Sequence, residues 1–427
     1  MGTSFRAYNP EQTLLLPPSL NDWLPADHLA HFINETVDEL ELDGFYDKYE
    51  EDGRRNQPFE PRMMLKVLVY GYSTGTFSSR KLAKKLEEDV AFRYLAANNF
   101  PHHRTICDFR KQHLELFEDL FVQIVQIAQR VGLVKLGTVA IDGTKIKANA
   151  SKHKAMSYKR MKEEQKKLKS EIEEIKREIS ARTKRAENED EEEDRQYGKD
   201  KRGDELPAEL QRREDRLRKI REARKELEER VKAEKDKKPE DKAQINFTDS
   251  ESRIMKTKDG FDQCYNVQSA VDAEAHIVVA VAVSQSSSDT ESLIPMVDAV
   301  KENTGKHAKK TLADAGYRSE KNFQGLADRE LYALVSLGRE GKPEPNISNE
   351  DLKLTAEMQR RLKSKKGKEL YKKRKAIAEV PFSWLKAGMG FRKFSVRGVA
   401  KVVGESFLAF LALNIKRLST RMVWQAA

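Results

Sequence analysis

Cysteine is scarce in this chain of 427 residues, and the two that occur, Cys107 and Cys264, lie far apart. They form no C-x-x-C pair, so the sequence predicts neither a disulfide framework nor a zinc site, and we expect a reducing compartment. Long apolar runs are also missing, since the longest, Phe407–Leu413, is much too short to span a bilayer. The segment Met1–Leu20 has no basic stretch followed by an apolar one, as a signal peptide would. We therefore expect a cytoplasmic protein without a membrane partner.

Charge is abundant but nearly balanced, with 80 Lys and Arg against 70 Asp and Glu and a net charge of +10. Such a modest excess indicates a polyanionic partner only where it is concentrated. One stretch concentrates it, because residues 360–375 contain ten Lys or Arg and a single acid, Glu369. A solvated helix face usually mixes both signs, so this density favours contact with a phosphate backbone.

The N-terminal part, residues 1–130, has a helical pattern. Ser78-Ser79 precedes a segment with Leu82 and Leu86 on one face and basic residues on the others. After Pro101, Thr105–Asp108 fits a capping box and predicts that a basic helix starts there. Short helices with a basic one last are compatible with a helix-turn-helix DNA reader, although basic helical bundles without DNA contact are common. If it is a reader, Arg104, Arg110 and Lys111 are the residues expected to contact DNA.

Residues 155–242 differ sharply in composition from the rest. Apolar residues repeat at heptad-like spacing in a Lys/Glu background, first at Leu168, Ile172, Ile175 and Ile179, and again at Leu210, Leu217, Ile220, Leu227 and Val231. The acidic run Glu187–Asp194 between them is expected to be a solvated loop. The pattern predicts an antiparallel coiled-coil hairpin inserted into another domain.

Strand signals occur on both sides of this insertion, at residues 137–147, 265–272, 276–283, 311–317 and 332–337. A helix capped by Asp289-Thr290-Glu291 and closed by Gly305 follows the third strand, and Ser319 caps another helix after the fourth. Three meandering strands followed by alternating helix and strand predict an α/β fold with a mixed five-stranded sheet flanked by helices.

Two acids end strands that this order makes neighbours. Asp142 ends the first strand and Asp314 ends the fourth, so we expect their carboxylates side by side. Two adjacent carboxylates cannot both stay ionised cheaply, and a divalent cation removes that cost. A third acid, Glu379, follows the basic run directly, and a third ligand would allow two ions to clamp a phosphoryl transfer.

These motifs together resemble a DDE-class transposase of a bacterial insertion sequence. The matching stretches are Asp142-Gly-Thr-Lys-Ile-Lys-Ala-Asn-Ala-Ser151, Tyr265–Asp272, Ala313–Tyr317, Phe100–Arg110 and the series Tyr371, Arg374, Glu379, Lys386. The last series is similar to the family's Tyr-Arg-Glu-Lys motif. Arg374 lies one position farther from Glu379 than the usual motif has it, and Lys375 would restore the usual spacing, so either cation could face the DNA.

The resemblance implies a ribonuclease-H-like catalytic core over residues 131–154 and 243–427, a helical DNA-binding domain over 1–130 and a helical insertion over 155–242. It implies that Asp142, Asp314 and Glu379 are catalytic and bind two Mg²⁺ ions, for which Mn²⁺ could substitute. The cations implied to contact DNA are Arg104, Arg110, Lys111, Lys145, Lys147, Arg374, Lys375, Lys386, Arg392 and Arg397, together with Tyr371. The implied partners are double-stranded DNA, as terminal inverted repeats and target, and a second copy of the chain, in a nucleoid-associated bacterial setting.

Three other functions are compatible with parts of the pattern. A DNA-binding protein derived from such an enzyme could have lost catalysis, although all three acids are present in their motifs. A protein whose hairpin is the functional part would not need the acids. A structure-specific nuclease would cut DNA without terminal repeats equally well.

Overall fold

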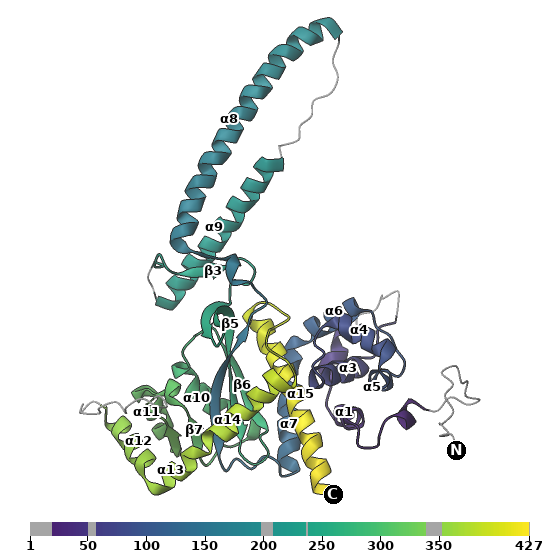
Figure 1. The fold of residues 1–427 in the computed structure, drawn as a ribbon, viewed down its shortest axis with the longest axis vertical. Helices are drawn as coiled ribbons and strands as arrows, with labels where there is room; N and C mark the ends of the chain where they lie inside the picture. Colours follow the sequence, from purple (N-terminus) through teal and green to yellow (C-terminus); the bar gives the residue numbers. More distant parts are fainter. Residues whose placement is uncertain (1–18, 50–56, 198–207, 236–237, 339–351, 427) are drawn as a thin grey trace, which may run out of the picture.

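A computed structural model describes residues 19–49, 57–197, 208–235, 238–338 and 352–426. Three parts are visible in Figure 1: a helical N-terminal region, a sheet flanked by helices, and a long helical hairpin that projects from one end of the sheet. The described residues outside the hairpin share one hydrophobic core, and the hairpin has a smaller core of its own.

The N-terminal region is helical, as its pattern predicts. Its elements are η1 (Leu20–Trp23), α1 (Leu29–Asp38), α2 (Asp43–Tyr46), η2 (Asp47–Tyr49), α3 (Pro61–Ser73), α4 (Ser79–Glu88), α5 (Val90–Leu95), α6 (His103–Gln112), η3 (Leu114–Leu116) and α7 (Phe117–Arg130). The apolar α3 is buried along almost its whole length, and Pro61 stands at its start, where a proline costs no hydrogen bond. The predicted start at Thr105 is wrong, because α6 begins at His103 and the ring of His102 accepts the N-terminal hydrogen bond from Arg104.

The sheet contains the five predicted strands and one more. They are β1 (Val139–Lys147), β5 (Gly260–Asp272), β6 (Val278–Ser284), β7 (Thr311–Ala313) and β8 (Ala333–Val335), with β4 (Arg253–Thr257) added beside β5. The strand order is β4-β5-β1-β7-β8, and β6 pairs with the remaining part of the same β5 edge. Pairing is antiparallel between β1 and β5 and parallel between β1 and β7. The mixed sheet is therefore confirmed, with β1 at its centre.

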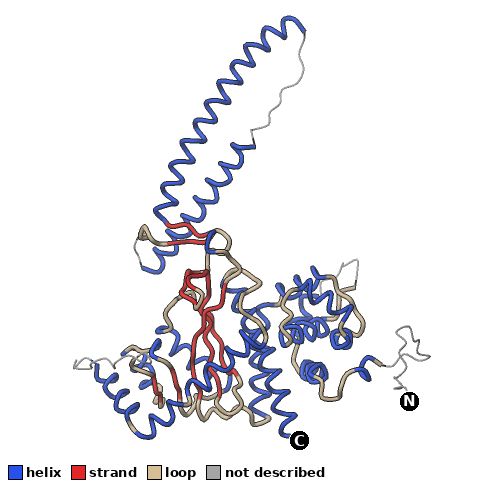
Figure 2. The backbone as a smooth tube through the Cα atoms, in the orientation of Figure 1, coloured by secondary structure: helices blue, strands red, loops and turns tan. Residues whose placement is uncertain are grey.

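Helices cover the sheet and connect its later strands, as Figure 2 shows. They are α10 (Leu293–Thr304), η6 (Ala315–Tyr317), α11 (Glu320–Asp328), α12 (Lys353–Lys363), α13 (Lys365–Lys372), α14 (Arg374–Ser383), the π-helical turn η8 (Trp384–Gly388) and α15 (Val399–Ala426). Gly305 ends α10 in the left-handed conformation, with φ of 78°, as its position predicts. Pro381 lies inside α14, and the π-helical turn follows it directly.

The C-terminal helix α15 joins the N-terminal region to the sheet, because it packs against α3, α7 and β6. Its apolar residues Phe407–Leu413 are buried. Glu405 lies fully buried within this helix and accepts a hydrogen bond from the Tyr72 hydroxyl (2.8 Å). Despite the length of α15, no helix in the described ranges could span a membrane.

The insertion forms the hairpin in Figure 1, made of α8 (Tyr158–Tyr197) and α9 (Ala208–Lys235). At its base, the short strands β2 (Ala155–Ser157) and β3 (Gln244–Asn246) pair antiparallel. Leu168, Ile172, Leu217, Ile220 and Leu227 are buried between the two helices, as their spacing predicts, whereas the side chains of Ile179 and Leu210 lie outside the described residues. The acidic run is not a loop, because α8 continues through it to Tyr197.

Candidate active site

The central strand pair brings two carboxylates together. The parallel register aligns Ile141 of β1 with Ala313 of β7, so the next residues, Asp142 and Asp314, lie opposite each other. The Gly143 N–H donates to Asp142 Oδ1 (2.9 Å) within β1, and the Gly316 N–H donates to Asp314 Oδ1 (2.8 Å) in the turn that follows β7. The prediction that Asp142 ends its strand is wrong, because β1 continues past it to Lys147. The proximity expected from strand order is therefore present.

The electrostatic surroundings of Asp142 disfavour its charge. Burial raises the pKa of Asp142 from 3.8 to about 6, and the neighbouring negative charge of Asp314 adds to the increase. The positive charge of Arg374 opposes this shift, and Glu379 contributes a smaller increase in the pKa. Asp142 thus lies within the electrostatic range of both other acids.

Glu379 approaches this pair from α14, with Arg374 between them. Arg374 Nη1 lies 4.0 Å from Asp142 Oδ2, and Arg374 Nη2 lies 4.0 Å from Glu379 Oε1. The Arg374 side chain is 14% exposed and that of Glu379 is 49% exposed, so the acid is at the open side of the site. Arg374 Nη1 is buried and has no hydrogen-bond partner.

The three acids are the kind of ligand that a hard divalent cation prefers, although they do not form one ligand cluster. No three His, Cys, Asp or Glu in the described part of the chain lie close enough together to form such a cluster. Asp142 and Asp314 supply the carboxylate oxygens that Mg²⁺ prefers. The raised pKa of Asp142 reflects a negative charge that a bound cation would neutralise. The guanidinium of Arg374 lies between Glu379 and this pair.

The other residues of the Tyr-Arg-Glu-Lys series surround the acids. Tyr371 donates its hydroxyl to the carbonyl of Ala313 (3.2 Å), directly before Asp314. Lys386 is half-buried and donates to Thr144 Oγ1 (2.6 Å) and to the Lys145 carbonyl (2.9 Å), so it is anchored on β1. Burial lowers the pKa of Lys386. Lys375, by contrast, is exposed.

The remaining predicted DNA contacts near the sheet differ in their surroundings. Lys145 forms an ion pair with Asp289 (3.2 Å) and Lys147 with Asp262 (2.9 Å). Arg392 and Arg397 are exposed and donate to backbone carbonyls of Lys386 (2.9 Å) and Asn149 (3.0 Å).

The basic helix α6 carries cations in two different environments. Arg104 and Lys111 are exposed, as a DNA contact requires. Arg110 is 4% exposed, and its Nη1 donates to the Tyr72 hydroxyl (3.2 Å) and the Phe77 carbonyl (2.8 Å). The prediction that Arg110 contacts DNA is therefore wrong, because its guanidinium is buried in the core near Glu405.

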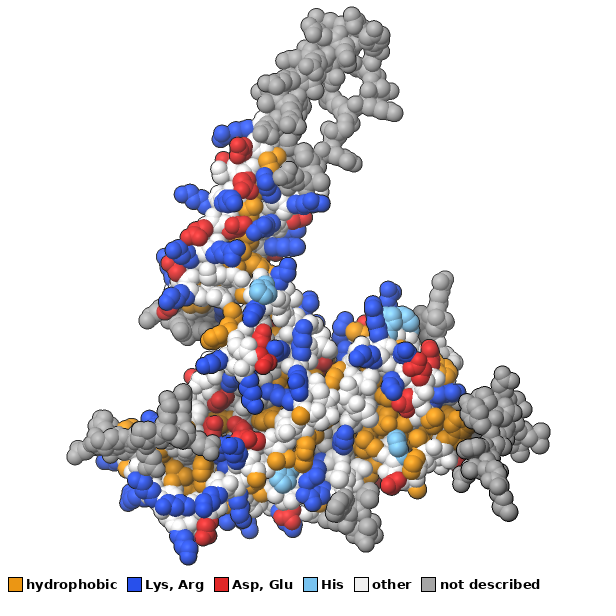
Figure 3. Space-filling model, viewed as in Figure 1, with side chains coloured by type: hydrophobic (Ala, Val, Ile, Leu, Met, Phe, Trp, Pro, Cys, Tyr) orange, Lys and Arg blue, Asp and Glu red, His pale blue; other side chains and the backbone are white. Residues whose placement is uncertain are grey.

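Basic side chains are widespread on the face shown in Figure 3, over the hairpin, the N-terminal helices and the C-terminal segments. A small group of acidic side chains lies among them near the middle of the molecule. This distribution suits a polyanion, whose approach to acidic groups needs compensating positive charge.

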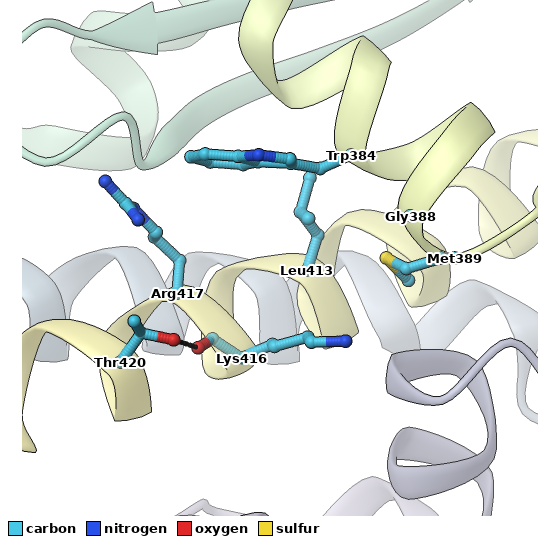
Figure 4. Close-up of a pocket in the computed structure, with 7 residues that line it drawn as sticks. All are labelled: Trp384, Gly388, Met389, Leu413, Lys416, Arg417 and Thr420. Carbon is cyan, nitrogen blue, oxygen red and sulfur yellow. Dashed lines mark hydrogen bonds between the residues drawn. The ribbon is translucent and has the colours of Figure 1, made fainter.

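A separate pocket of about 220 Å³ lies between η8 and α15 (Figure 4). Arg417 stacks over the Trp384 ring at 4.5 Å, and the pocket is otherwise lined by Gly388, Met389, Leu413, Lys416 and Thr420. None of the three candidate acids lines this pocket, so it is distinct from the candidate active site. Trp384 is half-buried at the pocket wall.

Asp289 is a polar residue of this region that the sequence pattern predicted only as a helix cap. Asp289 makes no side-chain capping bond, and its Oδ1 instead accepts from Asn266 (2.6 Å), Gln268 (2.7 Å) and Lys145 (3.2 Å). The polar residues Asn266 and Gln268 within a predicted strand were the available signal, because amides that become buried in a sheet require partners.

Comparison with known proteins supports the family suggested by these motifs. A family model described as "Transposase DDE domain" matches residues 135–415, and one described as "Transposase domain (DUF772)" matches residues 18–112. Searches of curated proteins and of solved structures found no match. The first family match spans well over half of the chain and contains the sheet and all three acids. The chain therefore belongs to the transposase DDE-domain family and is a DDE-type insertion-sequence transposase.

Proposed function

We propose that this transposase binds the ends of its mobile element, hydrolyses a phosphodiester there, and joins the resulting 3′-hydroxyl to target DNA. Asp142, Asp314 and Glu379 are the catalytic acids of this proposal. The observation that carries it is the parallel register of β1 and β7, which pairs Asp142 with Asp314 beside the α14 residue Glu379.

The acids would hold the divalent ions, with Asp142 and Asp314 as a half-buried pair and Glu379, which is more exposed, as the third ligand. Two Mg²⁺ ions, or Mn²⁺ in their place, would supply charge neutralisation for the attacking and leaving oxygens of an in-line displacement. The chain itself contributes positioning: the Gly143 and Gly316 N–H groups donate to the two aspartates, and Tyr371 holds the end of β7.

The DNA would run along exposed cations rather than buried ones. We propose Lys375, Arg392 and Arg397 as phosphate contacts near the acids, and Arg104 and Lys111 as contacts on the N-terminal helices, because all five are exposed. Arg374 is closer to the acids, where its charge offsets theirs. Lys386, Lys145 and Lys147 would contact DNA while they keep the hydrogen bonds and ion pairs that they form on the sheet.

We propose the following division of labour within the chain. Residues 1–130 recognise the element ends, residues 131–154 and 243–427 form a ribonuclease-H-like catalytic core, and residues 155–242 form a coiled-coil hairpin. The separate small core of the hairpin supports its assignment as an insertion. Joining two ends requires at least a dimer of the DNA-bound chain.

The test is cleavage of DNA that carries the element's inverted repeats, with Mg²⁺, Mn²⁺ or Ca²⁺ and mapping of the cut ends. Asp142→Asn, Asp314→Asn and Glu379→Gln should each abolish nicking, while the matched control Glu291→Gln, an exposed acid, should cut like the wild type. Ca²⁺ should support binding without cutting. Undiminished cleavage by any of the three catalytic-site variants would refute that residue's role, and equal cutting of DNA without repeats would instead indicate a general nuclease.

A further inference from the structure

Asp289 lies on the face of the sheet opposite to the one that carries Asp142, and beside the turn that follows Asp314. Side chains alternate along a strand, so Lys145 of β1 points away from the face that carries Asp142. Asn266 and Gln268 of β5 are the register partners of Lys145 and Gly143. All three polar side chains donate to Asp289 Oδ1, and both amide residues are fully buried. Asp289 is thus the common hydrogen-bond acceptor of three polar side chains on this face of the sheet.

Two glycines allow this carboxylate to approach the backbone next to Asp142 and Asp314. A Cβ added at Gly143 would lie 2.8 Å from Asp289 Oδ1 and 2.4 Å from Gln268 Nε2. A Cβ added at Gly316 would lie 3.0 Å from Asp314 Oδ1 and 3.3 Å from Asp289 Oδ2. Asp289 therefore borders the residue that follows Asp142 and also the turn that holds Asp314.

The neighbour of Asp289 fixes the Asp314 turn as well. Thr290 donates its hydroxyl to the Gly316 carbonyl (3.0 Å). Asn322 donates to the carbonyls of both Thr290 (2.6 Å) and Tyr317 (2.7 Å), and the Tyr317 hydroxyl donates to Gln268 Oε1. The segment from Asp289 to Thr290 is therefore bonded to β1 and β5 on one side and to the Asp314 turn on the other.

We propose that Asp289 is a positioning residue that sets the spacing of Asp142 and Asp314 for divalent-metal binding. The inference rests on the proposed metal site at those two acids. Asp289 acts through the β1 backbone at Gly143 and the turn after Asp314, and does not itself touch the ion. Partners that orient metal ligands in this way influence affinity strongly, because a ligand pair with the wrong separation cannot share a cation.

Calorimetric titration of the metal-free full-length protein with CaCl₂ tests this role without relying on catalysis. Asp289→Ala should weaken Ca²⁺ affinity about tenfold or more. Asp289→Asn keeps an oxygen for Asn266 and Gln268 but loses the ion pair with Lys145, so its affinity should fall by a smaller factor. Glu291→Gln, an exposed acid near Asp289, should bind Ca²⁺ like the wild type. The melting temperature of every variant is measured in EDTA.

The outcomes separate this inference from the metal site on which it depends. Weaker Ca²⁺ binding by the Asp289 variants, with Glu291→Gln unchanged, supports it. Wild-type affinity in Asp289→Ala overturns it, and if that variant does not fold, wild-type affinity in Asp289→Asn overturns it equally. If the wild type binds no Ca²⁺, or Asp142→Asn binds it undiminished, the proposed metal site itself is wrong, and the inference is overturned with it.

Discussion

Arg374 lies between Asp142 and Glu379, with a guanidinium nitrogen 4.0 Å from a carboxylate oxygen of each. At that separation the groups attract without forming a hydrogen bond, and Nη1 is left without a partner in a buried position. One cation thus partly neutralises a site that would otherwise concentrate negative charge. The pKa of Asp142 remains raised to about 6, so this compensation is incomplete.

The raised pKa of Asp142 predicts a stability that falls with pH in metal-free protein. The folded-state pKa of about 6 exceeds the ordinary value of 3.8, so the folded chain binds more protons between these values. This contribution is fully present below the ordinary pKa and is lost as the pH rises through about 6. A shift of this size corresponds to about 3 kcal/mol. Urea unfolding in EDTA from pH 4 to pH 8 measures it.

The Asp142→Asn variant is the control, because it removes the titrating group. Its free energy of unfolding should lack this component, and Mg²⁺ at neutral pH should stabilise only the wild type. Identical pH dependence in the two proteins would contradict the assignment of the shift to Asp142.

Replacing Arg374 or Lys375 by Gln should separate two effects of neighbouring cations. Arg374→Gln removes the charge that lowers the pKa of Asp142, so the acid limb of the pH–cleavage profile should move to higher pH. Lys375→Gln should leave that limb in place and reduce the slope of log affinity against log salt by about 1. Filter binding at several salt concentrations, beside pH–rate profiles, measures both. The reverse pattern would make Arg374 the phosphate contact.

Arg110 and Arg104 lie on the same helix, but their substitution by alanine should have different effects. Arg110→Ala should destabilise the fold by about 3 kcal/mol, because it removes the guanidinium buried against Tyr72 near the buried Glu405. Arg104→Ala should keep its melting temperature and lose about one unit of salt slope in DNA binding. Thermal unfolding and salt-dependent binding distinguish them. A stable Arg110→Ala protein with weak DNA binding would restore the original DNA role.

Removing the hairpin should leave single-end cleavage intact. The Tyr158 N–H donates to the Ala243 carbonyl (2.8 Å), so a short Gly-Ser linker can replace residues 160–241 without moving β2 or β3. Nicking per end should stay within about threefold of the wild type, since the hairpin has its own core. Gel filtration with paired ends then tests for a role in assembly. Leu227→Ala, which disturbs the hairpin without shortening the chain, is the companion variant, and loss of nicking in both would place the hairpin in the cutting step.

Local patterns in the sequence were sufficient for the sheet and its central acid pair. The β-branched runs at Val139–Lys147 and Val278–Ser284, and the glycines after Asp142 and Asp314, are short-range signals. The strand order followed from the meander and the later helical connections, and it brought Asp142 next to Asp314. These features needed no knowledge of distant contacts.

The remaining features depend on partners far away in the sequence. Arg110 has the same local surroundings as an exposed cation, and only the approach of Tyr72 and Glu405 makes it a core residue. Asp289 fits a capping pattern, but its hydrogen bonds are to β1 and β5. Tertiary contacts decide such positions, and no local pattern encodes them.

Because α15 packs at once against α3, α7 and β6, the N-terminal helices and the strands of the candidate active site share one hydrophobic core. A duplex gripped by the proposed N-terminal reader would then meet the acids at a constant offset along its axis. The cut would therefore fall at an invariant number of base pairs from the recognised sequence.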